Sequence, residues 1–165
     1  MDLGHWVTEL IIEEDKLPYG FIYIITNMVN GKKYIGKKQM KSVKKLKPLK
    51  GRKNKRHFDI ETDWKTYTSS STELNQDIMD LGKANFKFEI IHLCDSKFEL
   101  AYYEAKKQFN ADVLLNENYY NGIINCRIGR APDALLKKLE QNKTDPTIPV
   151  NAHAENNTRS DDSGC

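Results

Sequence analysis

The stretch FIYIITNMVNGKKYIGKK, residues 21–38, decides the fold because it contains two short strand-like segments around a turn. Residues 21–26 are rich in Ile, Tyr and Phe, which favour strands, and residues 33–36 form a shorter partner. Asn30 and Gly31 lie between them, and this dipeptide is typical of tight hairpin turns because it tolerates positive φ angles. The stretch therefore predicts a β-hairpin.

Each predicted strand carries one tyrosine, Tyr23 or Tyr34, and Gly36 ends the second strand. Side chains alternate between the two faces of a strand, so the two phenols can lie near each other on the paired strands. Most tyrosines in strands, however, pack in a core with the hydroxyl at its rim. The spacing alone leaves both interpretations open, core packing and phenols presented to a substrate.

Basic residues are concentrated in one segment, although the net charge of the chain is only +3. Residues 17–57 contain no Asp or Glu, and residues 32–56 contain thirteen of the 26 Lys and Arg residues. Such a run is often a solvated face or a disordered loop. Clustered cations also bind the phosphates of nucleic acid, because binding releases condensed counterions.

The composition indicates a globular protein of one domain with short appendages. Hydrophobic residues make up 39% of the 165 residues and charged residues 30%, and no apolar run approaches the roughly 18–20 residues of a membrane span. The acidic N-terminus lacks the features of a secretory signal. The cysteines, Cys94, Cys126 and Cys165, form no CxxC pair. We therefore expect no membrane partner, no disulfide framework or zinc site, and a cytoplasmic location.

The remaining pattern predicts a small sheet with helices packed against it, an α+β fold. Residues 5–16 favour a short helix or strand, and residues 86–93 favour a further strand. Residues 37–63 lack strong periodicity and favour a long loop with at most a short helical piece. Residues 123–128 favour a short strand or extended segment, and residues 131–140 a terminal helix.

Two capping boxes mark the starts of helices. Ser70 and Glu73 begin the first helix, which ends at Gly82, and Ser96 and Glu99 begin the second. The apolar residues at helical spacing in the second helix, which we expect to form its buried face, are Phe98, Ala101, Tyr102, Ala105 and Phe109.

Three polar features outside the hairpin are candidates for chemistry, and each also has a simpler interpretation. Glu104 flanks the apolar face of the second helix, where a carboxylate is usually solvated but can hold Mg²⁺ together with waters and phosphate oxygens. His57 ends the basic run and is exposed on the simpler interpretation. Residues 69–71 are serines that begin a helix, and free N–H groups at such a start can also bind phosphate. No Walker loop, dinucleotide fingerprint, HExxH or catalytic-serine motif is present.

The order of these features resembles the GIY-YIG nuclease superfamily. Residues 21–23 and 34–36, ten residues apart, are similar to the paired family motif. The DWKTYTSSSTEL element, the NFKFEIIHL strand, a helix with Glu104 and the YYN of residues 119–121 follow in the family's order. The resemblance covers about residues 19–130 and is greatest to free-standing, phage-type members of the homing-endonuclease branch.

The resemblance implies a compact domain with a three-stranded antiparallel sheet that cuts double-stranded DNA with one divalent metal ion, Mg²⁺ or Mn²⁺. In the family the first tyrosine, here Tyr23, helps to activate the attacking water, and the second, here Tyr34, orients water or phosphate. Gly36 permits close approach. The helix glutamate, here Glu104, binds the metal ion, and the asparagine, here Asn121, supports the site.

Two positions depart from the family pattern. Phe21 stands where the family has glycine, although Gly20 is adjacent. The family also has an arginine that contacts the scissile phosphate about eight residues after the second motif, where this chain has Lys44. Arg56 is the first candidate for that role and Arg52 the second.

Lys38 is a further candidate for the missing cation, although lysine lacks the bidentate fork of arginine, and Ser70 is a further supporting residue. We expect the DNA backbone to cross the sheet beside the basic segment. The residues expected to bind DNA are Lys37, Lys38, Lys44, Lys45, Arg52, Lys53, Lys55, Arg56 and His57.

A phenol with a pKa of about 10 is a poor base, so we expect the lysines after the second motif and the metal ion to lower that pKa.

The leading hypothesis is a metal-dependent DNA endonuclease. The alternatives are a catalytically silent DNA- or RNA-binding module of the same fold and a basic domain that scaffolds nucleoprotein. In each case the domain spans residues 19–130 with a basic insertion at about 37–63, residues 1–18 form an N-terminal extension, and residues 131–165 form a short helix and a polar, mobile tail.

Overall fold

The computed structural model describes residues 1–144, which fall into two units that divide between Gly129 and Arg130. The second unit contains helix α3, Asp133–Thr144, which confirms the terminal helix predicted over residues 131–140. The tail that we predicted to be mobile lies outside the described residues from position 145 onward. All further elements belong to the first unit.

Three antiparallel strands form the central sheet, as the resemblance implies. Strand β1 (Gly20–Asn27) lies in the middle, between β2 (Lys33–Gln39) and β5 (Phe86–Cys94). In the turn between β1 and β2 the φ angle of Gly31 is 77°, a left-handed value that glycine adopts without strain. The predicted hairpin is therefore confirmed.

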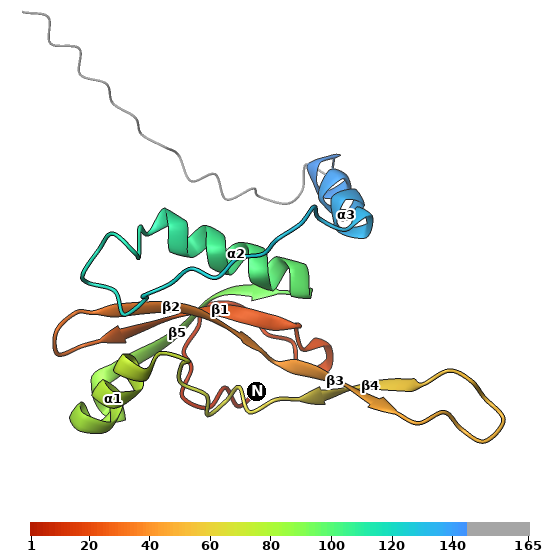
Figure 1. Ribbon diagram of the computed structural model, residues 1–165, viewed down its shortest axis with the longest axis horizontal. Helices are drawn as coiled ribbons and strands as arrows, with labels where there is room; N and C mark the ends of the chain where they lie inside the picture. The colour runs from red at the N-terminus through yellow and green to blue at the C-terminus, as the bar shows by residue number, and fades with distance from the viewer. Residues whose placement is uncertain (145–165) are drawn as a thin grey trace, which may run out of the picture. The chain divides into compact units, whose positions relative to one another are not determined.

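One face of the sheet packs against helix α1 (Thr72–Leu81) and the N-terminal segment (Figure 1). The core on this face contains Trp6, Tyr23, Trp64 and Leu74, each at most 3% exposed. The N-terminal segment joins the sheet as well as the core, because the N–H of Val7 donates to a β5 carbonyl oxygen over 2.9 Å.

Between this N-terminal contact and β1 the chain makes a short 3-10 helix, Glu14–Lys16. Residues 5–16, for which we predicted a short helix or strand, thus contain an isolated bridge and one helical turn. A second 3-10 helix, Lys83–Asn85, connects α1 to β5.

Helix α2 (Lys97–Asn110) covers the other face of the sheet (Figure 1). Leu100 of α2 packs there with Ile22 and Ile35. The predicted buried face of this helix is wrong in part: Ala105 is buried, but Tyr102 is 42% exposed. The residues buried along the helix are Leu100, Ala105 and Gln108. Phe98 and Tyr102 stack on each other instead, with ring centroids 5.8 Å apart.

Residues 37–63 do not form the loop that we predicted. After β2 they form a two-stranded antiparallel ribbon, β3 (Lys41–Leu46) with β4 (Arg56–Glu61), which reaches away from the three-stranded sheet (Figure 1). Almost every side chain of these strands is exposed on both faces. Apolar residues alternate with polar ones only over residues 57–61 of β4, and β3 shows no such alternation, so the sequence pattern does not indicate a pair of strands.

The helix starts agree with the capping boxes to within one residue. Ser96 caps α2 as predicted, because its hydroxyl accepts a hydrogen bond from the N–H of Glu99 over 3.2 Å. The cap of α1 is Ser71 rather than the predicted Ser70. The predicted end at Gly82 is confirmed, with a φ angle of 86°.

After α2 the chain returns along the free edge of β2. The N–H of Lys33 donates to the carbonyl of Asn118, and the N–H of Tyr120 donates to the carbonyl of Lys33, each over 2.8 Å. Residues 123–128, for which we predicted a short strand or an extended segment, form no regular element. Within residues 1–144, no helix is long and apolar enough to cross a membrane.

Candidate active site

A hollow of about 420 Å³ lies at the edge strand β2. Four parts of the chain line it: β2, the start of α1, α2, and the segment that follows α2. The lining residues are Tyr34, Lys37, Ser70, Ser71, Glu104, Gln108, Tyr120, Asn121, Gly122, Ile123 and Asn125. The structure thus brings together Tyr34, Ser70, Glu104 and Asn121 of the predicted site.

Tyr34 reaches this hollow from the face of the sheet that carries α1. Its hydroxyl lies 3.1 Å from the Ser70 hydroxyl, whereas the neighbouring Ser71 hydroxyl caps α1. Partial burial raises the pKa of Tyr34 above the usual 10.0, although the hydrogen bond with Ser70 acts in the opposite direction. Tyr34 is therefore a neutral phenol at neutral pH.

Tyr23 lies beside Tyr34 but is not exposed to the hollow. Only 1% of its surface is exposed, and the two tyrosine ring centroids are 6.1 Å apart. Gly36 is the cross-strand partner of Tyr23. A Cβ atom on residue 36 would lie 2.6 Å from the Tyr23 hydroxyl oxygen and 2.8 Å from Cε1 of Tyr34. The missing side chain of Gly36 is what allows both rings to pack there.

The pKa of Tyr23 is raised well above the usual 10.0, chiefly because burial penalises the phenolate. The neighbouring phenols of Tyr34 and Tyr67 and the carboxylate of Glu104 act in the same direction. The expectation that the lysines after the second motif lower the pKa of these phenols is therefore wrong. Both lysines form ion pairs with carboxylates instead.

Glu104 extends from α2 to β2, where its carboxylate lies 2.7 Å from the ammonium of Lys37. Lys37 is the cross-strand partner of Ile22, so it lies on the face covered by α2, opposite to Tyr34. The Glu104 side chain is 16% exposed and that of Lys37 is 38% exposed. The hollow therefore lies around the edge of β2, with a phenol from one face and an ion pair from the other.

Asn121 binds the backbone of β2 at Ile35, between Tyr34 and Lys37. Its side-chain oxygen accepts a hydrogen bond from the N–H of Ile35 over 3.0 Å, and its side-chain nitrogen donates to the Ile35 carbonyl over 2.8 Å. Gln108 of α2 donates to the same carbonyl over 3.0 Å. The amide of Asn121 thus replaces the backbone of a neighbouring strand and fixes the part of β2 that carries Tyr34.

A family model described as "Putative endonuclease segE, GIY-YIG domain" matches residues 6–124. The chain belongs to this family. The match includes the whole three-stranded sheet, α1, α2 and every residue that lines the hollow except Asn125. Among the curated proteins and the solved structures, no match was found.

The two candidate arginines do not lie at the hollow of this GIY-YIG domain. Arg56 pairs with Leu46 at the far end of the ribbon, and five residue steps separate it from Glu61 at the near end. At about 3.4 Å per residue, this separation is about 17 Å. Arg52 and Arg56 line a different hollow, of about 430 Å³, at the tip of the ribbon. The structure therefore does not bring Arg56 to Tyr34 and Glu104.

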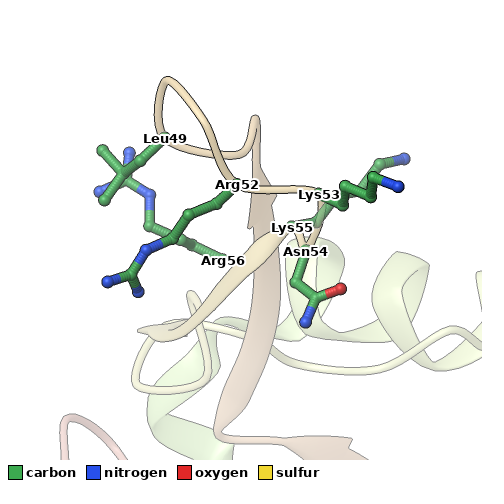
Figure 2. A pocket seen from close by; sticks show the side chains of 6 residues that line it. All are labelled: Leu49, Arg52, Lys53, Asn54, Lys55 and Arg56. Atoms are coloured by element: carbon green, nitrogen blue, oxygen red, sulfur yellow. The ribbon is translucent and has the colours of Figure 1, made fainter.

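Figure 2 shows this tip from close by. The side chains of Arg52 and Arg56 extend to one side of the turn, and those of Lys53 and Lys55 extend to the other. Most of the residues that we expected to bind DNA are thus exposed side chains of the ribbon: Lys44, Lys45, Arg52, Lys53, Lys55, Arg56 and His57. Only Lys37 and Lys38 of that set lie on β2.

Tyr67 is a neighbour of the site that lies in the DWKTYTSSSTEL element but is not among the predicted site residues. Its ring centroid is 6.4 Å from that of Tyr23, and a hydrogen bond between the two phenols contributes to the raised pKa of Tyr23. The ammonium of Lys38 lies 3.9 Å from the Tyr67 ring centroid and 2.6 Å from the carboxylate of Asp63. The signal for Tyr67 in the sequence is its place in that element, two residues before the first serine of the α1 start.

Proposed function

We propose that this GIY-YIG domain is a metal-dependent DNA endonuclease that hydrolyses phosphodiester bonds at the hollow beside β2. The observation that supports this most is that a phenol, a hydroxyl, a carboxylate and a cation line one hollow: Tyr34, Ser70, Glu104 and Lys37. Hydrolysis of a phosphodiester needs an oriented water and positive charge at the phosphate and the leaving oxygen. These side chains can supply the orientation and part of the charge.

The donor set at the hollow fits Mg²⁺ or Mn²⁺. Glu104 is the one carboxylate in its lining, and residues 1–144 contain no group of three or more His, Cys, Asp or Glu side chains that could hold a metal ion. Mg²⁺ suits such a site because it retains several waters and binds through one or two carboxylates together with phosphate oxygens. When bound, the ion would supply positive charge to the phosphate and the leaving oxygen. Zinc, which needs three or four protein ligands, does not fit.

We assign Tyr34 and Ser70 the orientation of the attacking water or of a phosphate oxygen. The other two hydroxyls in the lining have structural partners, because Ser71 caps α1 and Tyr120 donates to Asp77. Tyr23 is buried behind Tyr34 and Ser70 and keeps its proton at neutral pH because its pKa is raised. We therefore assign Tyr23 a part in water activation as a neutral phenol, which positions Tyr34 and Tyr67 and does not act as a phenolate base.

Lys37 takes the place of the missing family arginine in this proposal. It is the one cation in the lining of the hollow within the described chain. Lys38, by contrast, is paired with Asp63 and lies over Tyr67. We propose that a substrate phosphate draws the Lys37 ammonium away from Glu104, which leaves the carboxylate free for the metal ion.

A silent nucleic-acid-binding module stays the alternative, because Lys37 already neutralises Glu104 in the free protein. Nicking of a supercoiled plasmid, with Mg²⁺ or Mn²⁺ and with EDTA, separates the two. We expect wild-type protein to cut only with the metal ion, and Glu104→Ala protein to bind DNA without cutting it. Glu117→Ala, at an exposed position outside the hollow, is the matched control and should cut normally. Cutting by Glu104→Ala at the wild-type rate would refute the metal assignment, and binding without cutting by the wild type would favour the silent module.

A further inference from the structure

The β3–β4 ribbon has a fixed root and an exposed body. At the root, Met40 is fully buried and its carbonyl accepts a hydrogen bond from the N–H of Thr62 over 2.9 Å. Trp64 is also fully buried, and its indole N–H donates to the carboxylate of Glu61 over 2.7 Å. Beyond the root, no side chain from residue 42 to residue 60 is buried. The ribbon is therefore an arm that is fixed at its base, and no other part of residues 1–144 covers either of its faces.

The cations of this arm have no partner within the described chain. Residues 41–56 contain nine Lys and Arg residues, and none of them forms an ion pair with another residue among positions 1–144. The lysines nearer the sheet differ, because Lys32, Lys37 and Lys38 are each paired with a carboxylate. The charge of the arm is thus free for phosphates, whereas the charge beside the hollow is compensated.

One face of the arm also carries exposed apolar side chains. Phe58 lies opposite Lys44 on this face, and it is 42% exposed, while its neighbour Ile60 is 38% exposed. Arg56 belongs to the same face by strand alternation. In the grooves of DNA, arginine and lysine bind guanine edges and apolar side chains contact the thymine methyl group. This face therefore combines the side chains that read bases with the charge that binds the backbone.

We propose, on the basis of the proposed function, that the β3–β4 ribbon enters the major groove of B-form DNA beside the cleavage site and reads base sequence there. The major groove of B-form DNA is about 12 Å wide and admits a two-stranded ribbon. The major groove of A-form RNA is deep and narrow and does not. The partner that fits the arm is thus duplex DNA.

The chain connection fixes where the contact falls relative to the cut. Strand β2, which carries Tyr34 and Lys37, leads through a single residue, Met40, into β3. Gly51, in the turn of the ribbon, is fourteen residue steps from Lys37. These steps span at most about 50 Å, or about 14 base pairs at about 3.4 Å each. The bases read by the arm should lie on one side of the cut and within that distance.

The test uses the full chain in EDTA, so that binding is measured without cleavage. The probe is a pool of randomised DNA duplexes of about 40 base pairs, which is longer than the expected reach of the arm. In the shortened variant an Asn-Gly turn replaces residues 44–58, which keeps the pairs Lys41–Glu61, Ser42–Ile60 and Val43–Asp59. A second variant, Lys44→Gln with Arg56→Gln, changes two side chains only. Its charge-matched control is Lys106→Gln with Lys107→Gln on α2.

We expect wild-type protein to enrich a sequence from the pool, and the shortened variant to enrich none and to bind at least tenfold more weakly. Lys44→Gln with Arg56→Gln should lower the salt dependence of binding by about two phosphate contacts, and the α2 control should not. On the enriched duplex, methylation of guanine N7, in the major groove, should interfere with binding, and methylation of adenine N3, in the minor groove, should not.

Three results would overturn the ribbon proposal: an unchanged enrichment by the shortened variant, interference confined to adenine N3, or equal affinity for duplex RNA. A wild-type protein that enriches no sequence would overturn it as well. If the shortened variant does not fold, the variant with two substitutions and the methylation interference pattern still test the ribbon proposal. The binding test does not depend on the proposed nuclease activity, because a protein that never cuts DNA can still enrich a sequence. A shortened variant that cuts DNA at the same sites as the wild type would refute the ribbon proposal and leave the nuclease proposal intact.

Discussion

The hydroxyl oxygen of Tyr23 occupies the space above Gly36, so that a Cβ atom on residue 36 would lie only 2.6 Å from it. The two residues are direct partners in the β1–β2 hairpin. In the sequence the glycine of the second motif looks like the end of a strand. In the structure it is the position on which the packing of both site tyrosines depends.

Substitution of Gly36 by alanine should therefore displace the tyrosines without unfolding the protein. We expect the free energy of unfolding to fall by about 1–3 kcal/mol, as for other overpacked cores, and the rate of plasmid nicking to fall at least tenfold. Urea unfolding and the nicking assay measure the two effects. Gly122→Ala is the matched control, since Gly122 also lines the hollow but a Cβ atom there would meet no other atom within 4 Å. Equal behaviour of the two variants would contradict the packing argument.

Removal of the Tyr23 hydroxyl should abolish most of the cleavage and leave DNA binding intact. The ring stays in the core in Tyr23→Phe, so the change in the free energy of unfolding should be about 1 kcal/mol, the usual contribution of one hydrogen bond. Nicking rates and binding curves for Tyr23→Phe, Tyr34→Phe and Tyr67→Phe, measured in parallel, show which hydroxyls the reaction needs. Wild-type cleavage by Tyr23→Phe would remove Tyr23 from the proposed mechanism.

The raised pKa of Tyr23 predicts a loss of stability at alkaline pH. The folded pKa lies well above the value of 10.0 expected for the unfolded chain, so the folded state binds the phenolic proton more tightly. The stability that depends on this neutral phenol is complete below pH 10.0 and is lost as the pH rises toward the folded pKa. Urea unfolding across this range should show a smaller alkaline loss for Tyr23→Phe than for the wild type. Parallel curves for the two proteins would contradict the buried, neutral phenol.

The ion pair of Lys37 and Glu104 predicts opposite effects of the two residues on metal binding. In DNA-free protein, Lys37→Met should tighten the binding of Mn²⁺ several-fold, because the ammonium no longer competes for the carboxylate 2.7 Å away. Glu104→Gln should weaken Mn²⁺ binding to the level of buffer. Electron paramagnetic resonance of free Mn²⁺ measures both without any cleavage. Lys33→Met, at an exposed β2 position outside the hollow, is the control for the lost charge. Weaker Mn²⁺ binding by Lys37→Met would show that the two cations do not compete.

Asn121 should contribute more to the stability of β2 than to the chemistry. Asn121→Ala leaves the N–H of Ile35 without its partner, and a buried donor without a partner costs about 1–3 kcal/mol. Hydrogen exchange at the Ile35 amide should become faster, and urea unfolding should occur at a lower concentration. Asn125→Ala, at an exposed position of the same hollow, should change neither. Unchanged exchange at Ile35 would mean that the side chain does not hold the strand.

The sequence predicts those elements that pack into the core, because their apolar content is visible in it. Strand β1 buries Tyr23 on one face and Ile22 on the other, and its Ile and Phe content indicates a strand directly. The arm of β3 and β4 is exposed on both faces, so the alternation that identifies a strand is limited to residues 57–61 of β4, and the lysines of the segment suggest a loop. Helix α2 is capped by Ser96 as predicted, yet its buried face includes Gln108, which no scale of hydrophobicity identifies.

For the candidate site, the sequence indicates single residues, but it does not indicate the contacts between residues that are far apart in the chain. Tyr23, Tyr34, Glu104 and Asn121 are found from motif order alone. The pairing of Lys37 with Glu104 depends on how α2 packs against β2, and no local pattern contains it. The position of Arg56 depends on the register of the ribbon, which a loop assignment cannot give.

The hydrogen bonds along β2 have a further consequence for the protein in solution. A site on the outermost strand of a sheet is open to substrate, but such a strand is also a template for pairing with another chain and for aggregation. Here the backbone of residues 118–120 and the side chain of Asn121 occupy the outward groups of Lys33 and Ile35. On the opposite border of the sheet, Val7 occupies those of Phe88 and Ile90. At these positions the backbone N–H and C=O groups are already hydrogen-bonded and cannot pair with the strand of another chain, while the side chains of the site stay accessible.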